Sequence, residues 1–408
     1  MSHFCRHCGA LLSHEVIDLG HQPPSNAYLS VEQLLLPEIT YPLKVYVCTE
    51  CWLVQLPAHA AAEDLFTADY AYFSSTSQSW CAHAERFVTA AIAKLGLGPH
   101  SQVVELASND GYLLQYMQQR GIPCLGIEPT HATAIAARVK GIETIERFFG
   151  TALAQELIGE GAPVSGGADL VVANNVLAHV PDINDFVAGI TRLLKPQGRA
   201  SIEFPHLLQL LKGNQFDTIY HEHYSYLSLR VVQRIAEQSG LVVVDVEELS
   251  THGGSLRVWM AHQDTAESSA TVAEVLAAEV AGGLEKVAAY ADFQQRAEAA
   301  KYGLLEWLLR AKRQGKRVLG YGAAAKGNTL LNYAGIQADL LEAVADRAVS
   351  KQGQFLPGSH IPVISPEQMA DLKPDELLVL PWNLIDELRQ QLSEYSLVTA
   401  IPELKQWS

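Results

Sequence analysis

The sequence predicts an α/β protein with three domains, on the strength of three observations. Two C-x-x-C pairs lie near the N-terminus. Residues 76–264 then alternate short apolar runs with helix-like segments, as a parallel sheet requires. A second, shorter series of such segments follows an Ala/Glu/Gln-rich helical stretch at residues 265–313. We therefore expect domains at residues 1–75, 76–264 and 265–408, in keeping with a length of 408 residues.

Composition and charge argue against several classes of protein. The formal net charge is −16 at pH 7, which disfavours unspecific binding to nucleic acid or to anionic membranes. The N-terminus "MSHFCRHCGALL" lacks the basic start and apolar run of a secretory signal, and no apolar run is long enough to span a bilayer. We expect neither a nucleic-acid nor a membrane partner, and a cytoplasmic location.

The paired cysteines predict a structural zinc site. "CRHC" contributes Cys5 and Cys8, and "CTEC" contributes Cys48 and Cys51. Each C-x-x-C turn brings two sulfurs together, and four thiolates complete a tetrahedral Zn²⁺ shell without leaving a position for water. In a reducing compartment this spacing favours a metal over disulfides. Two alternatives stay open: four reduced structural cysteines, or a nearby histidine in place of one cysteine.

The middle segment predicts a doubly wound sheet with an unusual end. "SQVVELASNDGYLLQYMQQRG" predicts a strand, a tight turn and a helix, and "IPCLGIEP" and "ADLVVANNVLAHVPD" each predict another buried strand. The last two predicted strands, "LVVVDVEEL" and "GSLRVWMAH", are joined only by "STHGG", which predicts a hairpin. A parallel sheet that ends in an antiparallel hairpin is similar to the Rossmann-like layout of class I S-adenosylmethionine (SAM) methyltransferases. Near the C-terminus, "KRVLGYGAAAKGNTLLNYAG" begins a second, smaller Rossmann-like domain.

The turn after the first strand of the middle segment is a candidate cofactor site. Glu105 ends the strand and Gly111 lies in the turn, whereas Ala107 and Asn109 stand where methyltransferases usually have glycine. The loop alone is therefore weak evidence for a bound nucleotide. Glu128 strengthens it, because a carboxylate at the end of the second strand can accept hydrogen bonds from both ribose hydroxyls.

A later strand of the same predicted sheet adds polar residues. Asn174 and Asn175 end this strand, and His179 follows in the same loop. Ligands of such sheets bind in the crevice beyond the carboxyl ends of the strands, so we expect both asparagines at the cofactor site. His179 either borders the methyl donor or is a partly exposed loop histidine.

The run "YHEHYSY" begins at Tyr220 and concentrates proton-active side chains. A metal site is disfavoured, because His221 and His223 are two residues apart and diverge in a strand or a helix. A polar, aromatic-rich loop packed at a domain interface stays possible. We favour a general base: neutral histidine, with a pKa of about 6.5, suits proton abstraction. Glu222 can orient the imidazole, and Tyr220 can donate a hydrogen bond to an oxyanion.

Several motifs together resemble a known family, the three-domain SAM-dependent C-methyltransferases that act on nucleotide-linked keto-deoxysugars. The resemblance covers essentially the whole chain. It rests on the paired "CRHC" and "CTEC" and on "YFSSTSQSW", "ELASNDGYLL", "YHEHYSY", "THGGSLRV" and "GYGAAAKGN". The Tyr-His-Glu-His and His-Gly-Gly-Ser-Leu-Arg runs are the specific ones. Ala107 departs from the family pattern, and its methyl group should narrow the cofactor loop without abolishing SAM binding.

The resemblance implies a role for each domain. The first holds structural zinc, the second holds SAM and the third helps to hold the nucleotide sugar. It also implies that His223 is the general base, with Tyr220, His221 and Glu222 around the sugar. The base would remove a proton beside a keto group, expected at C4, and the neighbouring carbon, expected to be C3, would then be methylated.

Further residues are candidates for the substrate site. Lys326 and Asn328 lie in a glycine-rich strand-to-helix turn, where backbone N–H groups favour the diphosphate that the resemblance implies. Arg257, on the strand after "THGG", is another candidate for the diphosphate. Lys326 and Arg257 each have the alternative of a purely structural or surface charge. Residues of "YFSSTS" are expected to line the sugar pocket, namely Tyr72, Ser74 and Ser75.

Two other functions fit parts of the sequence. The zinc knuckles fit a zinc-containing methyltransferase or binding module that acts on RNA or another acceptor, although the acidic balance and the absence of a basic stripe speak against RNA. The glycine-poor loop fits a non-catalytic scaffold. We expect a monomer whose partner is a small nucleotide sugar. Which sugar, which nucleotide and which pathway stay open.

Overall fold

The middle part of the chain forms a mostly parallel β-sheet with an antiparallel hairpin at one edge. The computed structural model describes residues 3–61, 65 and 73–407. The strands are β6 (Val103–Leu106), β7 (Cys124–Ile127), β8 (Thr144–Ile145), β9 (Ala168–Asn174), β10 (Leu194–Pro205), β12 (Leu241–Leu249) and β13 (Ser255–His262). Their order is β12-β13-β10-β9-β6-β7-β8, and β13 runs antiparallel to both neighbours. The predicted class I methyltransferase sheet and its terminal hairpin are confirmed.

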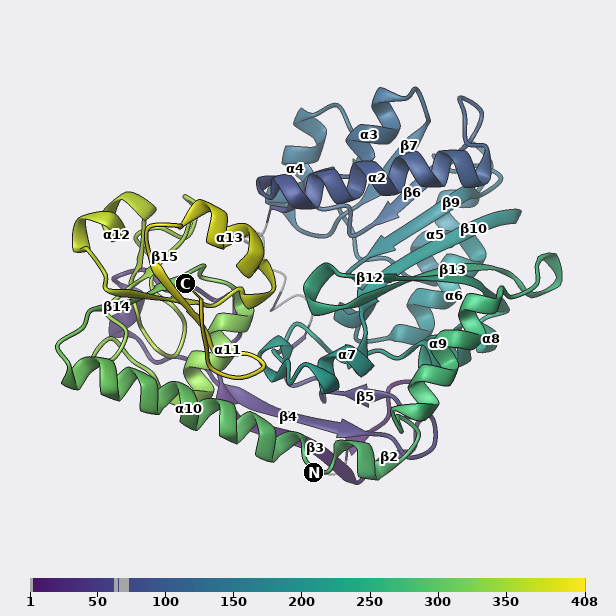
Figure 1. Ribbon diagram of the computed structural model, residues 1–408. Helices are drawn as coiled ribbons and strands as arrows, with labels where there is room; N and C mark the ends of the chain where they lie inside the picture. Colours follow the sequence, from purple (N-terminus) through teal and green to yellow (C-terminus); the bar gives the residue numbers. More distant parts are fainter. Residues whose placement is uncertain (1–2, 62–64, 66–72, 408) are drawn as a thin grey trace.

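Helices cover both faces of this sheet (Figure 1). One layer contains α2 (Gln78–Leu95), α3 (Leu114–Gln119) and α4 (His131–Val139); the other contains α5 (Thr151–Ile158), α6 (Ile183–Leu193), α8 (Leu229–Gln238) and α9 (Ala270–Ala281). Successive strand residues point to opposite layers. Val104 and Val171 belong to the core under α5 and α6, whereas Val103 and Leu170 pack with α2 and α3. Burial on both faces explains why these strands are continuous apolar runs.

The N-terminal part carries the cysteine cluster. Its strands are β1 (His3–Phe4), β2 (Leu11–Leu12), β3 (His14–Gln22), β4 (Tyr41–Val47) and β5 (Val54–Gln55). The Sγ atoms of Cys5, Cys8, Cys48 and Cys51 all lie within 4.8 Å of one another. Two of the pairs are 3.5 and 3.6 Å apart, close to the ~3.8 Å that a tetrahedral shell with Zn–S bonds of about 2.3 Å requires. The predicted Cys₄ zinc site is confirmed.

One strand of the N-terminal sheet comes from far along the chain. β11 (Ser225–Tyr226) pairs antiparallel with β5, so the sheet has the order β11-β5-β4-β3. β11 is the end of the "YHEHYSY" run, and α7 (Leu207–Lys212) precedes that run. The run is therefore attached to the zinc-containing domain, although it follows a strand of the middle sheet. The three domain boundaries stay a prediction.

The C-terminal part contains a second parallel sheet. Its strands are β14 (Val318–Tyr321), β15 (Val344–Ala345), β16 (Val363–Ile364), β17 (Glu376–Val379), β18 (Ser396–Thr399) and β19 (Lys405–Trp407). Their order is β16-β15-β14-β17-β18-β19, with only the β18–β19 pairing antiparallel in the described part of the chain. The helices are α11 (Ala325–Ala334), α12 (Pro366–Leu372) and α13 (Ile385–Gln391). The long helix α10 (Phe293–Arg313) runs beside the N-terminal strands and contacts both β3 and α11 (Figure 1).

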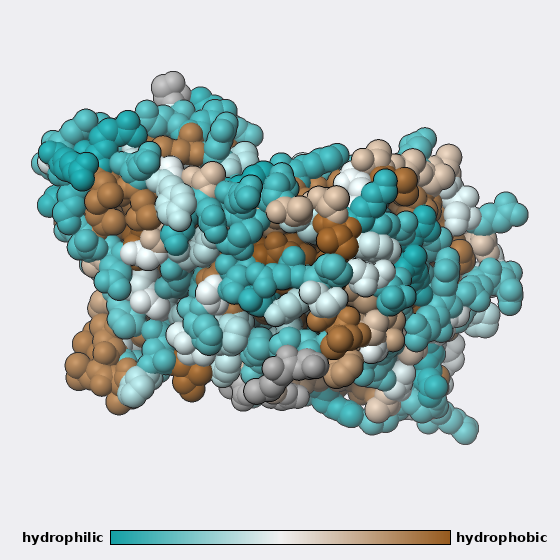
Figure 2. All heavy atoms as spheres, turned by 90° about the horizontal axis from the view of Figure 1, so that it is seen from below, coloured by the Kyte–Doolittle hydropathy of each residue, from teal (hydrophilic) through white to brown (hydrophobic). Residues whose placement is uncertain are grey.

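The molecular surface seen from below is mainly hydrophilic, with apolar groups gathered in separate patches (Figure 2). Among the exposed large apolar side chains are Leu35, Leu36 and Ile39, in and after the short 3-10 helix η1 (Gln33–Leu35). None of the described helices has the length and apolar character needed to cross a membrane.

Removal of zinc is expected to destabilise the N-terminal domain, because structural zinc contributes directly to folding free energy and its removal leaves buried thiolates without a cation. We predict that Cys48→Ser loses bound zinc and unfolds at a lower temperature than the wild type. Elemental analysis and thermal unfolding measure both effects. Cys81→Ser is the matched control and should keep its zinc; equal zinc content in the two variants would contradict the prediction.

Candidate active site

A cavity of about 580 Å³ lies where the parallel strands of the middle sheet end. Its wall includes residues that follow β6, β7 and β9, residues of the "YHEHYSY" run, and residues of the C-terminal domain. Asn26 adds a side chain from the N-terminal domain. The cavity therefore joins the predicted cofactor residues to the predicted base, in the crevice where open α/β sheets bind ligands.

The cofactor end of the cavity is formed by the turns after β6 and β7. Ala107 and Asn109 both line it with left-handed backbones, at φ of 53° and 50°. This conformation is the one that the usual glycines would adopt without strain. Glu128 is almost fully buried, and its carboxylate accepts N–H bonds of 2.9 Å from Asn109 and from Thr130. The carboxylate is thus fixed at the cavity wall, where it can also accept hydrogen bonds from a ribose.

Two predicted cofactor residues, Glu105 and Gly111, lie behind the cavity wall and do not line it. Glu105 is buried within β6 rather than at the cavity wall, and burial raises the pKa of its carboxyl well above its usual value. Gly111 has φ of 75°, and a Cβ there would lie 2.3 Å from Ile142 Cδ1. The glycine is therefore required by the turn and by close packing, and neither residue contacts the cavity. Sequence position alone could not separate these roles from cofactor contact.

The residues after β9 face the cavity as expected. Asn174, Asn175 and His179 all line it. Asn175 has a left-handed backbone (φ 51°), and its N–H donates to the Glu203 carbonyl at 2.7 Å. His179 Nδ1 donates to the carbonyl oxygen of Glu222 at 2.8 Å, so this histidine connects the β9 loop to the "YHEHYSY" run. Burial lowers the pKa of His179 to about 4.

His223 has the geometry of a general base. Its Nδ1 lies 2.8 Å from the Thr218 carbonyl oxygen, which can only accept, so Nδ1 carries the proton and Nε2 keeps its lone pair. The imidazole lines the cavity, with its ring centroid 4.0 Å from that of Tyr220 and 4.6 Å from that of His179. Burial, and then the neighbouring His179, lower the pKa of His223 well below 6.5. The ring is therefore neutral near pH 7.

The other two polar residues of the run face the N-terminal domain. His221 packs its ring against Tyr41, 5.8 Å away between centroids, and burial lowers its pKa to about 4. Glu222 is buried, accepts a hydrogen bond of 3.1 Å from Asn26 Nδ2, and has a pKa raised by burial. Neither lines the cavity. Their side chains hold the run against the first domain, and Glu222 does not contact the His223 imidazole as an orienting partner.

The C-terminal domain contributes two cationic side chains to the cavity, Lys326 and Lys351. Lys326 lies in the first turn of α11, its Nζ donates to Asn383 Oδ1 at 2.7 Å, and burial lowers its pKa. Lys351 donates to the Ala323 carbonyl at 2.7 Å. Two cations beside a helix N-terminus favour an anion at this end. Asn328 is buried elsewhere: its amide donates to the Ser25 carbonyl at 2.6 Å and joins two domains.

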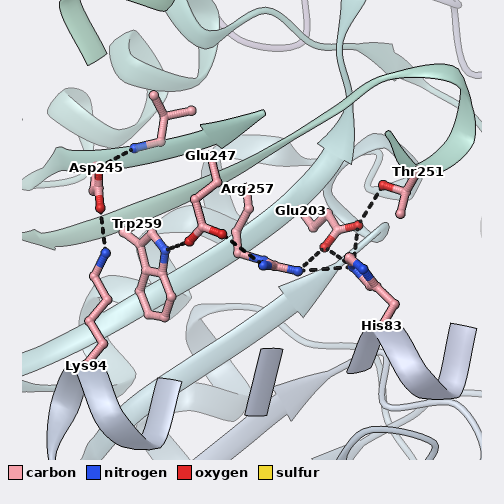
Figure 3. Close-up of polar contacts among 9 residues, drawn as sticks. His83, Lys94, Glu203, Asp245, Glu247, Thr251, Arg257 and Trp259 are labelled. Carbon is pink, nitrogen blue, oxygen red and sulfur yellow. Dashed lines mark hydrogen bonds and ion pairs between the residues drawn. The ribbon is translucent and has the colours of Figure 1, made fainter. Parts of the chain in front are cut away.

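Arg257 has a structural role instead of the predicted diphosphate contact. Its guanidinium is 5% exposed and pairs with Glu203 at 2.8 Å and with Glu247 at 3.1 Å. Figure 3 shows the guanidinium between these two carboxylates, and Arg257 does not line the cavity. A charged residue on a strand gives no sign of buried partners on other strands, which is why the sequence suggested a ligand.

The "YFSSTS" stretch approaches the cofactor loop. The Ser74 N–H donates to Asn109 Oδ1 at 2.8 Å, and Ser74 lines the cavity. Ser75 bonds through its hydroxyl to the carboxylate of Asp110 and lies off the cavity wall. Both serines are thus beside the cofactor turn rather than the predicted sugar pocket. Tyr72 lies outside the described residues.

Sequence reasoning missed some of the cavity wall. Trp80, at the start of α2, and His252, in the hairpin turn, both line the cavity, as do Lys351 and Asn383. The "THGG" motif was a visible signal for His252. Trp80 ends the "YFSSTSQSW" motif, which was a visible signal, whereas Lys351 and Asn383 lie in segments without a local pattern and only tertiary packing brings them to the cavity.

Comparison with known proteins identifies all three parts of the chain. Residues 5–66 match a zinc binding domain model, residues 80–246 a methyltransferase domain model, and residues 250–402 a C-methyltransferase C-terminal domain model. The C-methyltransferase NovU of Streptomyces niveus is 36% identical over 392 residues, which span 96% of this chain and 92% of NovU.

Solved structures show weaker similarity. Magnesium protoporphyrin IX methyltransferase from Synechocystis aligns with a TM-score of 0.36 and 16% identity over 45% of this chain and 83% of its own. A SAM-dependent methyltransferase from Mesorhizobium loti aligns with a TM-score of 0.35 and 14% identity over 43% and 97%. TM-scores at this level are too low to assign a function or a family to this chain. The full-length similarity to NovU and the three domain models do assign a family: the chain belongs to the family of three-domain, SAM-dependent C-methyltransferases with a zinc-binding N-terminal domain.

Proposed function

We propose that this C-methyltransferase acts on a nucleotide-linked keto-deoxysugar, with His223 as the base that removes a proton beside the keto group. The observation that carries the proposal is the single cavity in which a neutral imidazole, the Glu128 turn and two lysines meet. A carbon acid near His223, SAM near Glu128 and a diphosphate near Lys326 and Lys351 would together fill it. The expected positions remain a keto group at C4 and methylation at C3.

The proton transfer follows from the His223 tautomer. Nδ1 donates to the Thr218 carbonyl, so the lone pair on Nε2 accepts the proton from the carbon beside the ketone. The electrons of the C–H bond move into an enolate, whose charge rests on the former keto oxygen. Tyr220, packed on the imidazole, is the candidate hydrogen-bond donor to this oxygen. The His223 imidazolium later releases its proton to water.

The residues of the cofactor end fit SAM, whose bound form supplies an electrophilic methyl group to the enolate carbon. In this proposal the Glu128 carboxylate would accept hydrogen bonds from the ribose hydroxyls, and the backbone of the Ala107–Asn109 turn would approach the ligand. Phe148 and Phe149 also line the cavity, and their aromatic rings can cover the adenine ring of SAM. In the proposed reaction one substrate C–H bond and the S–CH₃ bond of SAM would break, one C–C bond would form, and the sulfonium would become a neutral thioether.

A mass-spectrometric assay in D₂O tests the proposal. Purified protein would be incubated with a panel of nucleotide-linked 4-keto-6-deoxysugars, with and without SAM. A methyl gain with SAM and deuterium uptake without SAM would support the reaction and the separate action of the base. If SAM binds and no sugar in the panel gains either label, the sugar class is wrong.

His223→Gln is expected to lower both deuterium uptake and methyl transfer by about 10²–10⁴-fold, the usual contribution of a general base. SAM affinity, measured by calorimetry, should stay within about twofold, because the cofactor contacts lie on other loops. His131→Gln is the matched control, since His131 is exposed and pairs with Glu146 away from the cavity wall. Full exchange activity in His223→Gln would assign the base elsewhere.

The pH dependence of exchange should show a base with a lowered pKa. A lowered pKa keeps His223 neutral at more acidic pH, so kcat/KM should be flat from pH 8 through about pH 6.5 and decline only below it. A stopped assay in a series of buffers of constant ionic strength measures the profile. An acid limb centred at or above pH 6.5 would contradict the assignment.

Lys326→Met is expected to raise KM for the nucleotide sugar by about tenfold or more and to change kcat less, because the charge contacts a part of the substrate that does not react. Steady-state kinetics at two ionic strengths measures the effect, which should shrink at high salt. Lys312→Met, a half-exposed partner of Asp339, is the control and should match the wild type. An unchanged KM in Lys326→Met would exclude the anion contact.

A further inference from the structure

The hairpin turn between β12 and β13 presents a histidine to the cavity in a strained conformation. His252 lies in the 3-10 helix η5 (Thr251–Gly253) with φ of 53° and ψ of 21°. A non-glycine residue is uncommon in this left-handed region, although histidine enters it more often than most. Such conformations persist only where the surroundings hold them, and they concentrate at functional sites.

Several hydrogen bonds hold the turn. The Gly254 N–H donates to the Thr251 carbonyl at 2.9 Å, and Gln215 Nε2 donates to the Gly253 carbonyl at 2.8 Å. The Thr251 hydroxyl donates to Glu203 Oε1 at 3.1 Å. The backbone of His252 is therefore fixed on both sides of the residue.

Glu203 links this turn to the middle sheet and to α2 (Figure 3). It is fully buried, and its carboxylate receives the Arg257 guanidinium at 2.8 Å and His83 Nε2 at 2.9 Å in addition to Thr251. Burial alone would raise the pKa of Glu203, but the His83 hydrogen bond and the Arg257 charge bring it below its usual value. An ionised carboxylate thus anchors the turn in a network that the predicted reaction does not use.

The His252 ring forms part of the cavity wall beside Trp80. Their ring centroids are 5.2 Å apart with the planes at 63°, and Trp80 in turn stacks on His83 at 4.9 Å. Among the described residues, neither ring nitrogen of His252 has a hydrogen-bond partner. Burial lowers the pKa of His252 to about 4, so the ring is neutral near pH 7 and offers one N–H donor and one acceptor.

The place of β13 in the sheet puts His252 at the substrate end. Between β13 and β7, which Glu128 directly follows, lie β10, β9 and β6. Four strand spacings of about 4.8 Å separate the two turns by roughly 19 Å. His252 instead lies close enough to Lys326 and to His223 for their charges to interact with its own. At this position, His252 can form a hydrogen bond with a substrate oxygen. That oxygen would lie between the carbon that His223 deprotonates and the anionic group near Lys326.

We propose that His252 is a further substrate-binding residue, whose neutral imidazole donates a hydrogen bond to an oxygen of the bound sugar between His223 and Lys326. This rests on the proposed function of the same cavity. The Glu203 network keeps the turn in its left-handed conformation, and so keeps the ring aimed at the substrate rather than at solvent.

Two substitutions at His252 separate the imidazole from the backbone. His252→Gly keeps the left-handed turn without strain and deletes the ring, whereas His252→Asn tolerates the same backbone and keeps an N–H donor. We expect His252→Gly to lose about tenfold or more in kcat/KM for both deuterium uptake and methyl transfer, and His252→Asn to recover part of that loss. SAM affinity by calorimetry and the thermal unfolding midpoint should stay close to the wild type.

His360→Gly is the matched control, because His360 has the same φ of 53° and pairs with Glu38 away from the cavity wall. It should leave kcat/KM unchanged. If the wild type is active and His252→Gly is within about twofold of it, the role of His252 is overturned while the proposed function stands. If the wild type neither exchanges nor methylates any keto sugar, the proposed function fails, and this inference with it.

The anchoring of the turn is tested at Thr251, a positioning residue. Thr251→Val removes the hydroxyl that donates to Glu203 and keeps the side-chain shape. We expect a rise of several-fold in KM for the sugar, with unchanged SAM affinity, and recovery in Thr251→Ser, which restores the hydroxyl. Equal KM values in Thr251→Val and Thr251→Ser would show that the Glu203 contact does not position His252.

Discussion

The pairing of β11 with β5 is the contact on which the active-site geometry depends. Two residues after His223, Ser225 pairs with Gln55, and the Leu56 N–H donates to the Tyr224 carbonyl at 3.0 Å. Gln55 in turn donates from Nε2 to Cys5 Sγ at 3.1 Å. His223, the proposed base, is thus joined through a short strand pairing to the cysteine cluster. A structural metal there would fix the position of His223 relative to the sheet that binds the cofactor.

Backbone strain is gathered around the cavity. Ala107, Asn109, Asn175 and His252 all line it with left-handed conformations. Asparagine and histidine tolerate this region better than most residues, whereas Ala107 has no polar side chain to compensate the cost. The turns after the neighbouring strands β6 and β9 and the hairpin turn thereby bring main-chain and side-chain groups into the cavity. Folding free energy from the layered cores, buried on both faces of the sheet, offsets this strain.

Local patterns were sufficient for the architecture and for part of the site. The five residues "STHGG" between two apolar runs predicted the hairpin, and cysteine spacing predicted the metal cluster, because both features arise within short segments. Glu128 follows a strand of the parallel sheet and lines the cavity as expected, and His223 lines the same cavity; their roles stay predictions. Arg257 and Asn328 were assigned to a ligand because their actual partners, Glu203 and the Ser25 carbonyl, come from distant strands and loops. Lys351 was missed for the same reason: the wall that it joins is created by domain packing.

Residues from all three domains line the cavity, so the stability of the assembled native protein depends on its ligands. Any molecule that binds only the assembled cavity stabilises the native chain by RT ln(1 + [L]/Kd), about 2.7 kcal/mol at a ligand concentration of 100 Kd. Such an increment exceeds the effect of most single surface substitutions. In a cell short of cofactor or substrate, the unliganded chain would open more often and become the better target for proteolysis. Metabolic supply would then set the lifetime of the enzyme as well as its rate.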